Sequence, residues 1–242
     1  MATRRGTNVP NTDTTPMPVA RRLAGIIAVV AIAAIVTQLG LNFARAAEQG
    51  RPLWMVPIDL YGYFTLWSNT LVAIITARYA LLGGGGDDGL IEDGLIDDGL
   101  FGRPWLLAAA VVYIVVVGLI YNLLLVGMNP QVGLRKAIDL IFHTVIPIAY
   151  PLWWLTQIPR RRLGWNALLP TLVLPIAYSL VAMGKGALTG RYAYFFIDVD
   201  RYGVAQVLLN IAGLALLYAV FMAVVIAYDR RWGGAAALNR SA

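Results

Sequence analysis

An aspartate and a histidine lie four residues apart in an apolar stretch of this sequence, at Asp139 and His143, and His143 is the only histidine in the chain. Four residues make about one helical turn, so both side chains share a helix face. The carboxylate can then hold one imidazole nitrogen and fix the position of the ring proton, which suits a general base. Two alternatives are a neutral histidine bonded to a neighbouring helix and an aspartate that caps the start of its helix.

A second polar group precedes another apolar run and contains Thr65, Ser68 and Asn69. Their spacing of three and four residues places them on one helix face. Thr65 offers a hydroxyl nucleophile, but a threonine needs an activating base before it can attack. The alternative is that these side chains bond back to the carbonyl one turn earlier.

Together these residues supply a nucleophile, a base and a group that orients the base. In the expected topology Thr65 and His143 both lie about five to seven residues into their membrane spans, roughly 8–10 Å below the same boundary at 1.5 Å per residue. We therefore predict that Thr65, His143 and Asp139 form a catalytic group, with Ser68 or Asn69 as oxyanion donors.

An aromatic segment at residues 190–203 follows the fifth apolar stretch and contains Arg191, Tyr194 and Asp198. Aromatic residues at this density are typical of the membrane interface. The alternative is a lid that excludes water from the site. As a lid, the segment would bring Tyr194 to the substrate and present Arg191 or Asp198 to a polar head group.

The composition indicates what must position these residues, since 59% of the 242 residues are hydrophobic and only 13% are charged. That balance predicts an all-α bundle of transmembrane helices. Although the net charge is +6, the arginines border apolar runs, so we expect membrane flanks and no nucleic-acid partner. Because cysteine is absent, the sequence excludes thiol chemistry, and we expect no metal or other cofactor. Six stretches qualify as spans, at about 23–43, 60–82, 105–127, 138–157, 166–183 and 203–228.

The expected organisation is a disordered tail at 1–20, a six-helix domain at 21–232 and a second tail at 233–242. With both termini inside, 12 of the 19 Lys and Arg residues fall on the cytoplasmic side. A loop at 83–104 repeats Asp-Gly-Leu units, which favours a solvated linker. Its carboxylates could suggest calcium, but the five-residue spacing does not match an EF-hand loop. Asn122 and Asn210 are predicted to be hydrogen-bond partners between helices.

Three motifs carry a family resemblance: Tyr63 to Asn69, Asp139 to Pro147, and Tyr192 to Asp198. They resemble bacterial six-span relatives of the androgen-induced-gene membrane family. The resemblance covers spans 2 to 6. It implies intramembrane threonine hydrolases that cleave fatty acid esters of hydroxy fatty acids, with Thr65 and His143 at the matching catalytic positions.

The sequence thus predicts a lipid ester hydrolase in a bacterial plasma membrane, acting on a membrane lipid or other acyl ester, with protein partners left open. The main alternative is a non-enzymatic lipid-binding or transport protein with a polar cavity. A third is a scaffolding protein whose acidic loop binds a partner.

Overall fold

The computed structural model describes residues 19–82, 99–128, 130–158 and 163–232, and every regular element in this part of the chain is a helix. Five helical segments are long and apolar enough to cross a membrane: Val19–Glu48, Pro104–Leu125, Gly133–Gln157, Trp165–Thr189 and Val199–Arg231. The prediction of an all-α, multi-pass membrane protein is confirmed at this level.

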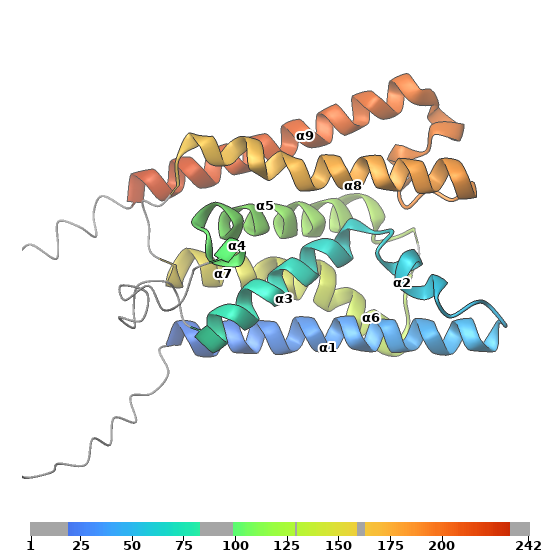
Figure 1. The fold of residues 1–242 in the computed structure, drawn as a ribbon, viewed down its shortest axis with the longest axis horizontal. Coiled ribbons are helices and arrows are strands. Elements are labelled where there is room, and N and C mark those ends of the chain that lie inside the picture. Colours follow the sequence, from blue (N-terminus) through green and yellow to red (C-terminus); the bar gives the residue numbers. More distant parts are fainter. Residues whose placement is uncertain (1–18, 83–98, 129, 159–162, 233–242) are drawn as a thin grey trace, which may run out of the picture.

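The elements of the described part of the chain follow one another as helices (Figure 1). One π-helical turn continues α5 at its end. A second π-helical turn joins α6 to α7, so that Gly133–Gln157 is one continuous helical segment. The helices are α1 (Val19–Glu48), α2 (Met55–Leu60), α3 (Phe64–Leu82), α4 (Gly99–Gly102), α5 (Pro104–Ile120), α6 (Gly133–Leu140), α7 (Ile146–Gln157), α8 (Leu168–Thr189) and α9 (Val199–Trp232); the π turns are Tyr121–Leu125 and Ile141–Val145, and 3₁₀ turns lie at Trp165–Ala167 and Phe195–Ile197.

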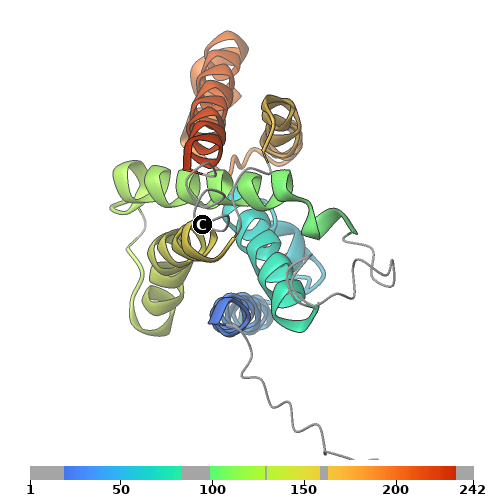
Figure 2. The same cartoon turned by 90° about the vertical axis from the view of Figure 1, so that its left-hand side faces the viewer.

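The helix α5 lies at the centre of the bundle, with α8 and α9 on one side and α1, α3, α6 and α7 on the other (Figure 2). Nearly all of its side chains from Leu106 to Gly118 are buried. A helix that is apolar all round is stable only when neighbours or lipid cover every face, and here the neighbours do so. The run Ala108 to Ala110 is 0–1% exposed, so small side chains let the other helices approach closely.

Several predicted boundaries were wrong. The second stretch is not a single helix from 60 to 82, because the short helix α2 and a turn precede α3. The helical segment that corresponds to the fourth predicted span begins at Gly133 and not at 138. The helix that corresponds to the sixth begins at Val199 and not at 203. Its backbone breaks at Gly203, where a φ of 75° favours glycine.

The predicted loop at 83–104 was also too long, because Gly99–Gly102 is helical and α5 starts at Pro104. The first tail was predicted to reach residue 20, but α1 begins at Val19. The tails before residue 19 and after residue 232, and the acidic repeat at 83–98, lie outside the described residues.

Candidate active site

The Thr65 hydroxyl and the His143 ring are in contact. Thr65 Oγ1 lies 3.3 Å from His143 Nε2. On the other side of the ring, Nδ1 lies 2.9 Å from the backbone carbonyl oxygen of Asp139 and 3.0 Å from its carboxylate Oδ1. The structure thus brings the three predicted residues together as a linear chain of polar contacts, from hydroxyl to imidazole to carboxylate.

This arrangement selects one tautomer of the neutral imidazole. Both groups that face Nδ1 are hydrogen-bond acceptors when Asp139 is ionised, so Nδ1 carries the proton and donates it. Nε2 is then left with its lone pair directed at Thr65, and the threonine hydroxyl donates to it. A hydroxyl that donates to an unprotonated imidazole is the arrangement that general-base activation requires.

Tyr121 holds this histidine–aspartate pair from the central helix. Its ring stacks on the His143 imidazole with a centroid separation of 3.6 Å and an interplanar angle of 10°. Its hydroxyl donates to Asp139 Oδ2, the carboxylate oxygen that His143 leaves free. Tyr121 therefore fixes both the plane of the ring and the orientation of the carboxylate.

The backbone around His143 is π-helical, and the sequence explains why. Pro147, four residues after His143, has no N–H group to donate to the His143 carbonyl oxygen. Asn122 fills this position from the neighbouring helix, donating at 2.9 Å to the His143 oxygen and at 2.8 Å to that of Gly118. Asn122 is thus the interhelical partner that the sequence predicted. Both Tyr121 and His143 lie in π-helical turns, which occur frequently at functional sites.

Gly118 allows the central helix to approach this turn. A Cβ atom at Gly118 would lie 2.8 Å from Pro147 Cβ and 3.2 Å from the His143 carbonyl oxygen. Neither neighbour is the end of a flexible side chain, so a larger residue would push the two helices apart. The site depends on this close packing.

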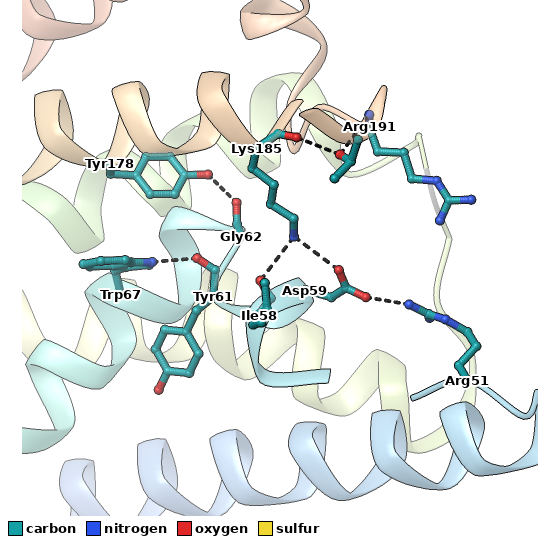
Figure 3. Close-up of polar contacts among 10 residues, drawn as sticks. Arg51, Ile58, Asp59, Tyr61, Gly62, Trp67, Tyr178, Lys185 and Arg191 are labelled. Atoms are coloured by element: carbon teal, nitrogen blue, oxygen red, sulfur yellow. Dashed lines mark hydrogen bonds and ion pairs between the residues drawn. The ribbon is translucent and has the colours of Figure 1, made fainter. Parts of the chain in front are cut away.

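Thr65 lies in the first turn of α3, whereas the predicted span placed it about five residues in. The turn before it is held by two hydrogen bonds seen in Figure 3, from Tyr178 to the Gly62 oxygen at 2.7 Å and from Trp67 Nε1 to the Tyr61 oxygen at 2.7 Å. Lys185 also donates to the oxygen of Ile58 in α2, at 3.1 Å. The count that gave equal depths used wrong helix starts.

Asp59 fastens the same region to α8. Its carboxylate accepts from Arg51 at 2.7 Å and from Lys185 at 3.2 Å (Figure 3). Partial burial by itself would raise the pKa of Asp59, but the two hydrogen bonds and the positive charges outweigh it and hold the pKa below its usual value. The ion pairs therefore join α2 to α8 near the start of α3.

Ser68 and Asn69 are both fully buried, and their side chains donate hydrogen bonds to backbone carbonyl oxygens. These contacts do not support the prediction that they are oxyanion donors. The Ser68 hydroxyl donates to the Thr65 carbonyl oxygen at 3.1 Å. The Asn69 amide donates to that same oxygen at 2.9 Å and to the Phe142 oxygen at 3.4 Å. Asn69 thereby joins the backbone behind Thr65 to the backbone beside His143, and neither side chain lines the cavity described next.

A cavity of about 540 Å³ reaches Thr65, Asp139 and His143. Residues 193–197 of the aromatic segment form part of its wall, together with residues of α3, α5, α8 and α9. Residues 193–197, called the covering segment below, thus lie in the wall of the cavity beside the site, and the lid alternative itself stays a prediction. Asn210, predicted to join two helices, instead donates to the Phe196 oxygen of this segment at 2.8 Å.

Tyr194 connects this segment to the start of α3, where Thr65 lies. Its hydroxyl accepts the Phe64 backbone N–H at 3.2 Å and also interacts with the side chain and backbone of Thr65. Burial raises the pKa of the Tyr194 phenol in spite of these hydrogen bonds. The phenol is protonated at neutral pH, so its own O–H group is available to donate beside Thr65.

Arg191 and Asp198 were predicted to meet a lipid head group, but neither lines the cavity. Asp198 Oδ1 accepts the Arg201 backbone N–H at 3.0 Å, so this side chain caps the start of α9. The Arg191 side chain is exposed and points away from Lys185 (Figure 3). The alternative that Asp139 is a helix cap is also wrong, because α6 begins six residues earlier, at Gly133.

The structure adds residues that the sequence reasoning missed. Tyr121 is one, although a tyrosine beside Asn122 near the end of an apolar span was a visible signal. Arg135 is another; it lies on the same helix as Asp139, one turn earlier, and lines the cavity together with Gln38, Asn42 and Arg45 of α1. Nothing in the sequence pairs α1 with α6, so their shared wall was not predictable.

The chain matches no protein-family profile, no curated protein and no solved structure. Among the described residues, no group of three or more histidine, aspartate or glutamate side chains is placed to hold a metal ion.

Proposed function

We propose that this protein is an intramembrane hydrolase of lipid esters in which Thr65 is the nucleophile, His143 the general base and Asp139 the residue that orients His143. The observation that carries the proposal is the chain of contacts from Thr65 Oγ1 through the imidazole to the carboxylate, at 3.3 and 3.0 Å. The resemblance to the androgen-induced-gene family points to the same two residues, Thr65 and His143.

In the proposed reaction, Thr65 Oγ1 attacks the acyl carbonyl carbon while its proton passes to His143 Nε2. Collapse of the tetrahedral intermediate breaks the ester C–O bond, and His143 returns the proton to the leaving alcohol. Water then attacks the acyl-threonine while His143 accepts a proton from it. Collapse breaks the bond between the acyl carbon and Thr65 Oγ1, His143 returns the proton to Oγ1, and the carboxylic acid is released.

Tyr194 is the proposed oxyanion donor, in place of Ser68 or Asn69. Its hydroxyl lies at the amino end of α3 beside Thr65, and we expect its O–H group to turn from Thr65 to the negative oxygen that forms there. The positive end of the α3 dipole lies at the same place and favours the same charge. Because Tyr194 belongs to the covering segment, closure of that segment would complete the site.

In the proposed topology, α3 crosses the membrane in addition to the five long apolar segments, which gives six spans. Both termini then lie in the cytoplasm of a bacterial cell. The 19 residues of α3 extend for about 28 Å, close to the thickness of the hydrocarbon layer. The beginning of α1 and the end of α9 lie at the same end of the bundle (Figure 1), and the excess of basic residues in the sequence favours the inside for that end.

Single cysteines test this topology cleanly, because the chain has none of its own. In intact cells, a thiol reagent that does not cross membranes should label Gln49→Cys, between α1 and α2, and should not label Arg230→Cys near the end of α9. Labelling of both variants, or of Arg230→Cys alone, would contradict the orientation.

A fluorophosphonate probe tests the catalytic assignment. Detergent-purified wild-type protein should be labelled, and Thr65→Ala and His143→Ala should not, whereas Thr65→Ser keeps the hydroxyl and should retain labelling. Thr156→Ala is a matched control, since Thr156 is an exposed threonine bonded only to its own helix and lies outside the cavity. Equal labelling of wild type, Thr65→Ala and His143→Ala would refute the proposal.

The cavity supports a second candidate, a lipid-binding or transport protein without catalysis. A pocket of about 540 Å³ falls in the range of small-molecule binding sites. That function predicts lipid binding or flux that survives Thr65→Ala, together with no covalent labelling of the wild type.

A further inference from the structure

The cavity has two chemically different sides. The side formed by α1 and α6 carries the amide and guanidinium groups of Gln38, Asn42, Arg45 and Arg135, together with the Asp139 carboxylate. The side formed by α5, α8, α9 and the covering segment is apolar and aromatic. Figure 2 shows α1 and α6 on the opposite side of α5 from α8 and α9. A molecule that fills the cavity therefore meets a polar, basic wall at one end and an apolar wall at the other.

The three residues from α1 form a continuous polar stripe. Gln38, Asn42 and Arg45 are spaced by four and three residues, so they share one face of the helix. Arg135 joins this stripe from α6, donating to Asn42 Oδ1 at 3.0 Å and to the Leu41 carbonyl oxygen at 2.9 Å. These contacts hold the guanidinium in place against α1.

The wall keeps an excess of positive charge, because it holds two guanidinium groups and one carboxylate, that of Asp139, which forms an ion pair with neither arginine. The two acceptors of Arg135 are both neutral, and within the described residues no aspartate or glutamate forms an ion pair with Arg135 or Arg45. Asp139 lies one turn from Arg135, but its two oxygens are engaged by His143 and Tyr121. Because Arg135 is half-buried, an anion here would meet a guanidinium that is only partly solvated.

We infer that Arg135 and Arg45 form a binding site for the anionic group of a single-chain amphiphile whose apolar chain extends past Thr65. The group is a carboxylate or a phosphate, both of which a guanidinium binds through paired N–H donors. Arg135 lies eight residues before His143, about 12 Å along the helix axis, so the charged group is held well away from the reacting atoms.

Only the statement that the bound amphiphile is a substrate rests on the proposed function. The binding itself can be measured without catalysis. The test uses the Thr65→Ala protein in nanodiscs of neutral phosphatidylcholine. Palmitate, 1-palmitoyl lysophosphatidate and neutral 1-palmitoylglycerol share one chain length and differ in head group. Their affinities are compared by calorimetric titration in low and high salt.

We expect at least one of the two anionic ligands to bind more tightly than 1-palmitoylglycerol, and the one that does identifies the head group. Arg135→Gln should weaken its binding by about tenfold and leave the neutral ligand unchanged. Gln retains an N–H donor for Asn42, so the fold should persist, and Arg135→Lys should restore part of the affinity because the charge remains. Arg45→Gln should act in the same direction.

Lys136→Gln is the matched control, because it removes the same charge from the neighbouring exposed residue outside the cavity. Equal effects of Lys136→Gln and Arg135→Gln would show nonspecific attraction and overturn the inference, as would an anionic affinity no greater than the neutral one. Selective anion binding without fluorophosphonate labelling of the wild type would refute the hydrolase and leave this binding site standing.

Discussion

Replacing Asp139 with asparagine separates two contributions to the His143 environment. In the variant, the Asp139 backbone carbonyl oxygen still lies 2.9 Å from Nδ1, so the ring proton keeps an acceptor and Nε2 still faces Thr65. What disappears is the negative charge 3.0 Å from Nδ1. The change therefore removes charge stabilisation of the imidazolium without removing the correct tautomer.

The expected loss follows from this geometry. Two unit charges 3.0 Å apart attract by about 5 kcal/mol at an effective dielectric constant of about 20. If roughly half of the positive charge has developed on the ring in the transition state, the loss is about 3 kcal/mol, or about 10²-fold in kcat. The same change in serine protease triads costs about 10⁴-fold, because the ring there settles in the wrong tautomer.

The assay is the hydrolysis of 4-nitrophenyl decanoate by detergent-purified protein, with kcat and KM measured separately. Asp139→Asn should lower kcat by about 10²-fold and leave KM unchanged, because the interaction strengthens only in the transition state. Asp200→Asn, an exposed aspartate outside the cavity, should retain wild-type activity. A loss near 10⁴-fold would show that the carbonyl does not hold the tautomer, and a loss of less than about fivefold would show that the carboxylate adds no charge stabilisation.

Three further outcomes are expected. Gly118→Ala should lower the melting temperature by an amount equivalent to about 1–3 kcal/mol, because its Cβ would lie 2.8 Å from Pro147 Cβ. Gly213 has open space around it, so Gly213→Ala should leave the melting temperature unchanged. Equal effects of the two substitutions would contradict the close packing at Gly118. Tyr194→Phe should reduce kcat by about 10²-fold at constant KM, and unchanged kcat would exclude it as the oxyanion donor. The pKa of Asp59 is lowered in the folded protein, so its ion pairs stabilise fully above its ordinary pKa of 3.8 and lose effect as pH falls through the lower folded value. The melting temperature of Asp59→Asn should therefore lie below that of the wild type at pH 6, and the two should converge in acid. A difference in melting temperature that does not change with pH would refute this role of Asp59.

The sequence predicted the features that depend on local spacing. Apolar runs located the helices, and the four-residue spacing of Asp139 and His143 placed their side chains together. Such features arise within one helix, where the 3.6-residue period fixes which side chains are neighbours. The predicted pairing of Thr65 with His143 was correct, although the depth argument behind it used wrong helix starts.

Features that depend on packing between helices were not predictable in the same way. The start of α3 was placed too early because Leu60 and the aromatic residues of the turn at Tyr61 to Tyr63 are apolar enough to be counted with the span that follows. Asp198 was predicted to meet a lipid head group because the sixth span was expected to begin at 203. The helix begins at Val199, which makes Asp198 the residue that caps it. Arg135 was missed because its partners lie on α1, more than ninety residues away.

The most direct test of the central claim is to locate the covalent intermediate. Wild-type protein treated with the fluorophosphonate probe, digested and analysed by tandem mass spectrometry should carry the adduct on Thr65, and the Thr65→Ser variant should carry it on the introduced serine. An adduct on Ser68 or on any other hydroxyl, or no adduct in a folded protein that binds lipid, would contradict the assignment of Thr65 as the nucleophile.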